Sequence, residues 1–115
     1  MRDASELLRD ILEAIAAIER YQDRTRAELE ADEMLQVWFL RHLQIIGEAA
    51  RMLPPDVRNL APDIPWSKII GMRNVLVHSY FDVDTDIVWD AVQKEIAPLK
   101  ASVERLLEKL DPDQA

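Results

Sequence analysis

The sequence predicts an all-α fold, an antiparallel bundle of four to five helices. Apolar residues make up 49% of the chain and only two of its 115 residues are Gly, a composition that favours helices over tight β-turns. Apolar side chains also recur every three or four residues, the spacing of helices that bury one face. We expect residues 1–110 to form a single domain with its own core, and residues 111–115 to be a frayed tail.

Two helices are expected in the first half of the chain. The first, over residues 4–24, carries an apolar stripe that consists of Leu7, Leu8, Ile11, Ile15 and Ile18 and ends at Tyr21. The second, over residues 31–53, has a broad face formed by Leu35, Trp38, Phe39, His42, Ile45, Ile46, Ala49 and Leu53. Pro54 and Pro55 should end it, because proline cannot continue a helix.

Two more helices follow a proline-rich connection. Pro65 suits the first turn of a third helix, from about residue 66 to residue 78. Asp82, Asp84 or Thr85 can cap a fourth helix that ends near Leu110. Its stripe is Val88, Val92, Ile96, Leu99, Val103, Leu106 and Leu110. Pro98 lies inside this helix and should kink or divide it.

The composition excludes several kinds of site. The chain has no Cys, so disulfides, thiolate zinc sites and a Cys nucleophile are excluded. Its two His and scattered acidic residues lack the spacing of metal ligands, and it has no Gly-rich loop to hold phosphates. We therefore expect no metal and no cofactor. No leader segment and no apolar run of about 18 residues is visible, so a cytoplasmic protein without a membrane partner is expected.

The net charge is unfavourable for binding nucleic acids. Fourteen basic against 22 acidic residues give a net charge of −8, which repels a phosphate backbone, and no DNA partner is expected. The acidic residues are unevenly distributed. Residues 54–84 contain three basic and four acidic side chains, so this segment is close to neutral.

The most informative segment is 73–80, in which Arg73 is followed after four residues by His78 and then, after one more, by Tyr80. A guanidinium, an imidazole that titrates near neutrality and a phenol provide the means to move a proton beside a phosphate. At about 100° per residue, Arg73 and His78 lie about 140° apart on a regular helix. They can converge only if the helix ends near His78 or if two chains contribute to one site. Asn74 lies one turn before His78 and can orient its imidazole.

The third helix also has two apolar arcs. Ile69 and Leu76 lie on one arc, whereas Ile70 and Val77 lie on the other. Two arcs need two surfaces to cover them, either within one bundle or through a partner chain, and a two-fold homodimer is the commonest solution.

These residues resemble the HepT-like branch of the HEPN superfamily. The resemblance spans nearly the whole chain and is strongest over residues 43–99. It rests on the Arg73-x4-His78-x-Tyr80 motif, the Ile45-Ile46-Gly47-Glu48-Ala49 run and Trp89. Ser79 departs from the pattern, because the family usually has Gly there.

The resemblance implies a homodimeric helical bundle in which the motifs of both chains line one cleft. It implies a metal-independent endoribonuclease, the toxin of a toxin–antitoxin pair, with Arg73 and His78 catalytic and Asn74 supporting them. Its partner would be a MntA-like minimal nucleotidyltransferase antitoxin, which transfers AMP to Tyr80 and silences the toxin. The RNA substrate, transfer or messenger RNA, stays open. The alternative is an inactive HEPN module that only binds the nucleotidyltransferase.

Other conspicuous side chains are expected to be structural. His42 lies on the buried stripe of the second helix. Glu48 could line the cleft, but a structural pairing with Arg51 or Arg73 is favoured. The three Trp residues are expected in the core or at an interface, where large aromatic side chains contribute most by burial.

Overall fold

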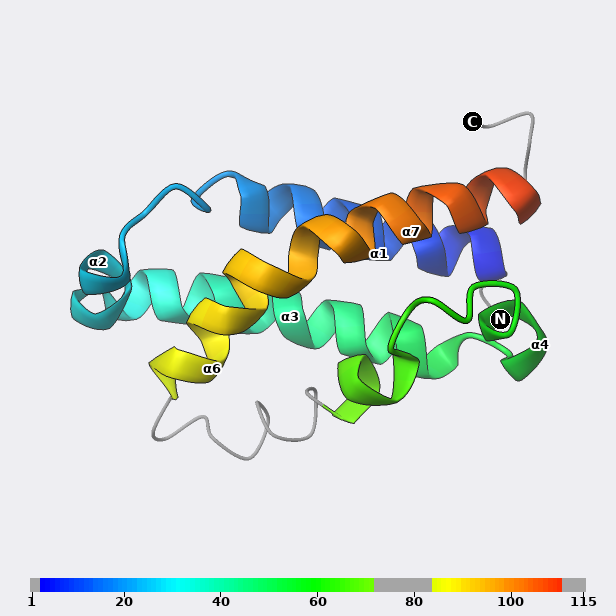
Figure 1. Cartoon of the computed structure of the whole chain (residues 1–115). Coiled ribbons are helices and arrows are strands. Elements are labelled where there is room, and N and C mark those ends of the chain that lie inside the picture. Colours follow the sequence, from blue (N-terminus) through cyan, green and yellow to red (C-terminus); the bar gives the residue numbers. More distant parts are fainter. Residues whose placement is uncertain (1–2, 72–83, 111–115) are drawn as a thin grey trace.

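The computed structural model describes residues 3–71 and 84–110, and the elements within these ranges are helical, which confirms the predicted all-α class (Figure 1). The order is α1 (Ala4–Glu19), α2 (Arg26–Ala31), α3 (Glu33–Met52), α4 (Pro55–Arg58), α6 (Thr85–Asp90), the π-helical turn η1 (Ala91–Glu95) and α7 (Ile96–Leu110). Residues 66–71 are also helical.

The core lies between α1, α3 and α7. α1 and α3 run side by side along most of the bundle, and α7 packs against α1 (Figure 1). The predicted stripes supply the buried side chains, which include Leu8, Ile11, Ile15, Ile18, Phe39, Val92, Ile96, Val103 and Leu106. The apolar spacing in the sequence therefore identified the faces that meet in the core.

The first helix is one turn shorter than predicted, and the short helix α2 that follows it in the sequence was not predicted. α1 ends at Glu19, and the turn that follows is closed by bonds from the Tyr21 amide to the Ile18 carbonyl and from the Arg24 amide to the Tyr21 carbonyl. A new helix, α2, then starts. The Thr25 side chain accepts from the Glu28 amide, and the Glu28 carboxylate accepts from the Thr25 amide. This reciprocal capping box fixes the break in the chain.

Helix α3 starts two residues later than predicted, because Asp32 caps it by accepting from the Leu35 amide. Pro54 and Pro55 end α3 as predicted, but Pro55 also opens the short helix α4, which was not predicted. Proline at the first position of a helix has no amide to leave unpaired, so Pro55 is well suited to start α4.

The last predicted helix is divided, as expected from Pro98. α6 begins at Thr85, with the Asp84 side chain accepting from the amides of Asp86 and Ile87. The π-helical turn η1 then separates α6 from α7. The Pro98 ring would clash with the carbonyl of Lys94 in a regular helix, and a wider turn at this point avoids that clash.

The π-helical turn also contacts the turn behind α1. The Gln22 side chain donates to the Val92 carbonyl at 2.8 Å, and the Gln93 side chain donates to the Gln22 carbonyl at 2.9 Å. This reciprocal pair joins two segments that are far apart in the sequence, so the interruption in the helix is held in place.

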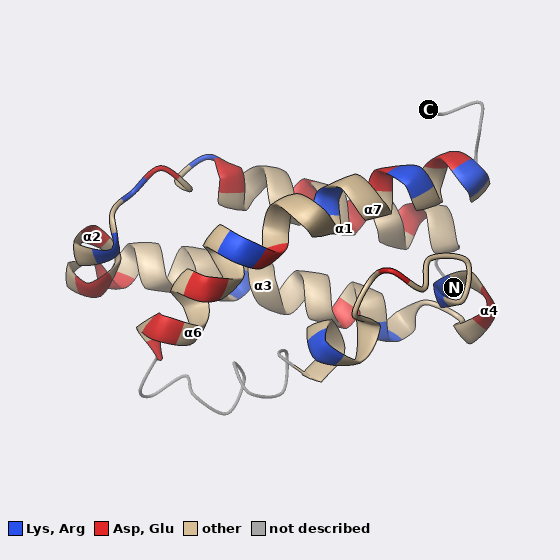
Figure 2. Cartoon of the chain, viewed as in Figure 1, with Lys and Arg blue, Asp and Glu red and all other residues tan. Residues whose placement is uncertain are grey.

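The surface is rich in charge. Acidic and basic residues are spread over the helices rather than separated into two faces (Figure 2). Many of them pair, for example Lys100 with Glu19 at 3.1 Å and Lys94 with Asp90 at 3.4 Å. Such exposed pairs contribute little to stability. No helix among the described residues is long and apolar enough to cross a membrane.

Candidate functional site

The motif residues lie between two elements that the structure describes. Arg73, Asn74, His78 and Tyr80 all fall within residues 72–83, outside the described residues. The helical segment 66–71 leads into this interval, and α6 follows it. Both lie on the same side of α3 (Figure 1). The local frame of the site can therefore be built from its two ends.

The upstream end is anchored by a buried tryptophan. Trp66 is only 9% exposed, and its indole Nε1 donates to the carbonyls of Arg58 and Ala61 at 3.1 Å each. Ile69, one turn later, is buried in the core. Trp66 thus belongs to the core, as expected, and holds the helical segment 66–71 against the connection after α4.

The same segment is also joined to the C-terminal helices. The Lys68 ammonium pairs with Glu95 of η1 at 2.5 Å. Next to this contact, Asp63 accepts from the Ser102 hydroxyl at 2.6 Å and from Arg105 at 3.2 Å. These hydrogen bonds, that of Ser102 foremost, lower the pKa of the Asp63 carboxyl. Asp63 is therefore ionised at neutral pH and links the proline-rich connection to α7.

The downstream end is the start of α6. Asp84 caps this helix, and Val88 is completely buried. Arg26 of α2 forms an ion pair with Asp86 in the first turn of α6. Both ends of the interval 72–83 are thus attached to the bundle, by Trp66 and Lys68 on one side and by Asp86 and Val88 on the other.

The two apolar arcs of the third helix differ in burial where they are described. Ile69 is 8% exposed, as expected for the arc that faces the core. Ile70, from the other arc, is half-buried and packs at the edge of the core. Leu76 and Val77 lie outside the described residues. Apart from its own helix backbone and chain neighbours, no heavy atom of the described residues lies within 4 Å of the position that a Cβ on Gly71 would take, so there is open space beside it in this part of the chain.

Glu48 forms the ion pair expected with Arg51. Its Oε1 lies 2.6 Å from the guanidinium Nη2, one turn further along α3. This hydrogen bond, together with the charge of Glu48, raises the pKa of Arg51. The pairing is a surface contact within one helix.

His42 packs as a structural side chain, in agreement with the sequence. Its ring lies 4.6 Å from that of Trp38 between centroids, at an interplanar angle of 62°. Its Nδ1 is buried and has no hydrogen-bond partner in the described part of the chain. Burial first, and the charge of Arg41 second, lower the pKa of His42. The imidazole is therefore neutral at pH 7.

Trp38 joins α1 and α3. Its indole Nε1 donates to the Ala17 carbonyl at 2.8 Å, and its ring meets that of Tyr21 edge-on at 5.5 Å. The Arg20 guanidinium lies 5.8 Å from the ring centroid. These contacts use the ring for packing, as expected, because its edge and its polar atom are both engaged.

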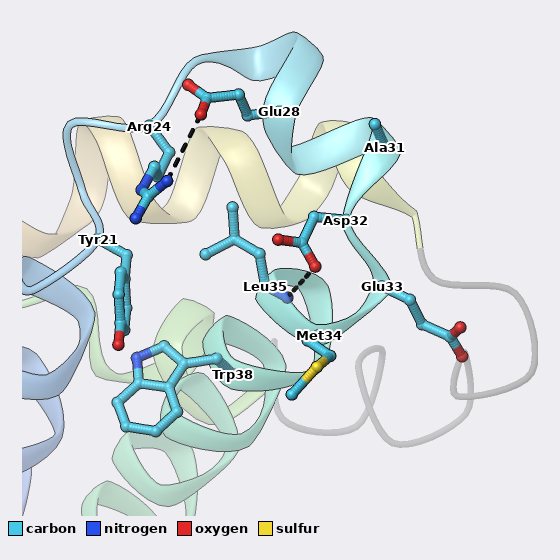
Figure 3. A pocket seen from close by; sticks show the side chains of 9 residues that line it. All are labelled: Tyr21, Arg24, Glu28, Ala31, Asp32, Glu33, Met34, Leu35 and Trp38. Carbon is cyan, nitrogen blue, oxygen red and sulfur yellow. Dashed lines mark hydrogen bonds and ion pairs between the residues drawn. The ribbon is translucent and has the colours of Figure 1, made fainter.

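A surface hollow beside Trp38 was not predicted from the sequence. It has a volume of about 690 Å³ and is lined by Tyr21, Arg24, Glu28, Ala31, Asp32, Glu33, Met34, Leu35 and Trp38. Tyr21, Arg24 and Trp38 line one side of it, and Asp32, Glu33 and Met34 the other (Figure 3). The hollow exists because the chain turns between α1 and α2, and the Thr25-x-x-Glu28 capping pattern was the signal that could have revealed it.

The charged side chains around this hollow form ion pairs and helix caps, and they do not converge on a reaction centre. Arg24 pairs with Glu28 at 3.6 Å, and Asp32 caps α3. Hydrogen bonds from Thr25 lower the pKa of Glu28, backbone first, so it stays ionised. Nor do the described residues contain a group of three or more His, Asp or Glu that could hold a metal ion.

Comparison with known proteins identifies the family. The model of the family "Ribonuclease HepT-like" matches residues 11–106, most of the chain. The chain belongs to this family. The HepT-like match includes the interval 72–83 and its two anchored ends, so the resemblance seen in the sequence is confirmed.

Two relatives illustrate the range of HepT-like proteins. "Probable ribonuclease HepT" of Thermococcus cleftensis is 38% identical over 106 residues, which cover 91% of this chain and 96% of that protein. "Gamma-glutamylcyclotransferase and putative RNase MJ0434" of Methanocaldococcus jannaschii is 36% identical over 114 residues. The match covers 98% of this chain but only 51% of that relative, so the chain spans about half its length. No solved structure matches the chain.

Proposed function

We propose that the chain is a metal-independent endoribonuclease, the toxin of a cytoplasmic toxin–antitoxin pair. The observation that carries the proposal is the HepT-like match over residues 11–106, which includes Arg73, His78 and Tyr80 at the motif spacing. The Thermococcus cleftensis relative, matched over 96% of its length, is named as a ribonuclease.

The motif residues suit RNA cleavage without a metal. The 2′-oxygen attacks the adjacent phosphorus while the bond from phosphorus to the 5′-oxygen breaks. A base must take the proton of the 2′-hydroxyl, and an acid must give one to the leaving 5′-oxygen. His78 can serve in either role, and Arg73 can hold the non-bridging oxygens with two donors as negative charge develops. The products are a 2′,3′-cyclic phosphate and a 5′-hydroxyl.

The mechanism requires two copies of the chain. Within the motif, one chain offers a single imidazole, whereas the reaction needs a base and an acid. A two-fold cleft supplies two copies of His78 and two of Arg73. In this arrangement Asn74 orients the imidazole of its own chain. The anchored ends of the interval 72–83 support the proposal, because a cleft between two chains needs each motif on a fixed part of its bundle.

Regulation is proposed to act on Tyr80. A MntA-like nucleotidyltransferase antitoxin would bind ATP and form a bond between the Tyr80 oxygen and the α-phosphorus, releasing pyrophosphate. The added AMP places bulk and negative charge two residues from His78. It would thereby repel the backbone of the RNA. The chain itself needs no cofactor for this step.

Assembly provides one test. The apolar arc of Ile70 and Val77 is proposed to lie against the second copy, so Val77→Glu would bury an unpaired charge. We expect the wild-type protein to be a dimer and Val77→Glu to be a monomer at micromolar concentration, as measured by light scattering. A monomeric wild-type protein would contradict the two-copy site.

A second candidate is a module that only binds the nucleotidyltransferase. The net charge of −8 favours it, because ribonucleases must overcome the repulsion of phosphates. Growth after expression of the wild-type chain without its partner separates the two candidates. Arrest is expected from a nuclease, and unimpaired growth from a binding module.

A further inference from the structure

The outward face of α3 carries apolar side chains that the bundle does not cover. Val37 is 55% exposed and Met52 is 49% exposed. On a helical wheel with about 100° per residue, Val37, Arg41, Glu48 and Met52 fall within an arc of about 60°. The buried residues of α3 point the opposite way: Phe39, Leu43, Ile46 and Ala50. The four side chains Val37, Arg41, Glu48 and Met52 are called the α3 face below.

The α3 face also has a cation without an ion-pair partner among the described residues. Arg41 is exposed and makes no ion pair within the described part of the chain. The positive charge of Arg41 disfavours protonation of the neighbouring His42, and it thereby helps to lower the pKa of that imidazole. Glu48, one of the acidic residues of α3, pairs with Arg51 at the edge of the face. Basic and acidic positions occur along the same helix (Figure 2).

The order of these residues makes the face complementary to itself. Along the sequence, Val37 and Met52 lie at equal distances from the point between Gln44 and Ile45. Arg41 and Glu48 also lie at equal distances from that point. Two antiparallel α3 helices that cross at this point would bring Val37 opposite Met52 of the second copy. They would also bring Arg41 opposite Glu48 of the second copy. A two-fold axis forms each contact twice.

We propose that the α3 face is a contact surface between two copies of this chain, in the antiparallel register centred between Gln44 and Ile45. The proposal rests on the two-copy site proposed above and names the surface that would hold the copies together. A left-handed crossing of about 20° keeps helices in contact over several turns, which this register needs. Val37 and Met52 are about 22 Å apart along the helix, at 1.5 Å per residue.

A hollow beside the face gives the second copy room to pack. It has a volume of about 520 Å³ and is lined by Glu33, Met34, Val37, Trp38, Arg41 and His42. Because Met52 of the second copy would lie opposite Val37, its flexible side chain can enter this hollow. Methionine adapts well to such irregular apolar spaces.

Charge favours a second copy over RNA on this surface. Glu33 and Glu48 would repel a phosphate backbone, whereas they pose no obstacle to a partner that presents Arg41. The register pairs the lone cation of the face with a carboxylate, and complementary charges of this kind set orientation at interfaces.

The test uses two charge reversals and their mixture. In the dimer of the Arg41→Glu variant, the new carboxylate faces Glu48 of the second copy in both symmetric contacts. In the dimer of the Glu48→Lys variant, the new ammonium faces Arg41 of the second copy in both contacts. Each variant alone should raise the dissociation constant of the dimer by roughly 100-fold, because like charges are costly at an interface. An equal mixture of the two variants should recover dimers, since the mixed pair has only opposite charges in contact. Sedimentation or light scattering measures the mass, and circular dichroism confirms that both variants fold.

The control is Lys94→Glu, an equal change of charge at a residue 72% exposed on η1. It should leave the dimer intact.

Arg41→Glu and Glu48→Lys proteins that remain dimeric, or a mixture of the two that remains monomeric, would overturn this inference. If Val77→Glu gives monomers while both charge reversals remain dimeric, the α3 face is excluded and the two-copy site stands. A monomeric wild-type protein would defeat both proposals. Reversals that leave the dimer intact but abolish binding to the nucleotidyltransferase would assign the face to that partner and overturn the inference.

Discussion

Replacement of His78 by alanine should abolish the growth arrest that the wild-type chain causes when it is expressed without its partner. The reason is chemical, because in the proposed mechanism the imidazole of His78 serves as base in one copy and as acid in the other. Loss of general acid–base catalysis costs about 10²- to 10⁴-fold in rate for each role. Both copies lose the group at once, so we expect cleavage to fall by at least the upper end of that range.

The other histidine provides the matched control. His42 packs against Trp38, and its buried Nδ1 makes no hydrogen bond with the described residues. His42→Gln should therefore retain the growth arrest if the protein folds. Toxicity that survives in His78→Ala would remove His78 from the mechanism. Growth that is unimpaired even with the wild-type chain would favour the binding module.

Tyr80→Phe should make the toxin insensitive to its antitoxin. The substitution keeps the ring but removes the oxygen that is proposed to accept AMP. Wild-type chain co-expressed with the nucleotidyltransferase should gain whole AMP units in intact-mass spectrometry, located at Tyr80 by peptide mapping. It should then lose RNA cleavage, because the added phosphate crowds Arg73 and His78 and repels the substrate. The Phe variant should gain no mass and should stay toxic.

Tyr21 is the matched control for this experiment. It is the only other tyrosine in the chain, and its ring packs edge-on against Trp38. Tyr21→Phe should be modified and silenced like the wild-type protein. If the partner neutralises Tyr80→Phe completely, or if AMP is found only at another residue, tight binding of the antitoxin would be the better explanation of silencing.

The core was predictable because its signal is periodic. The stripes from Leu7 to Ile18 and from Val88 to Leu106 lie in the core, and a burial pattern repeated over several turns outweighs local detail. The ends of the helices were less predictable. Tyr21 continues the first stripe, yet α1 stops at Glu19, because the Thr25 capping box starts a new helix within a few residues.

Proline interrupts one helix and starts another in this chain, and the presence of a proline does not by itself say which effect it will have. Pro98 divides the last helix through a π-helical turn that precedes it, as its missing amide and bulky ring predict. Pro55 was expected only to end a helix, but it also begins α4. Proline is compatible with the first turn of a helix and not with its interior, so its effect depends on where the chain turns.

The sequence predicted the motif of the candidate site and its family, but not the relative positions of the motif side chains. The spacing of Arg73, His78 and Tyr80 carried the resemblance, which the family match confirmed. On one regular helix Arg73 and His78 do not share a face, so their convergence depends on a second chain or on the end of the helix. The spacing of the motif does not by itself specify how two copies meet. The exposed α3 face became apparent only when burial separated Val37 and Met52 from the core.

The most direct test of the central claim is RNA cleavage by the purified wild-type protein in the presence of a strong metal chelator, with analysis of the product ends. The proposed site predicts that cleavage persists, that the products carry 2′,3′-cyclic phosphate and 5′-hydroxyl ends, and that His78→Ala purified in the same way gives neither. Cleavage that stops when metal is removed, or products with 5′-phosphate ends, would contradict a site in which Arg73 and His78 do the chemistry.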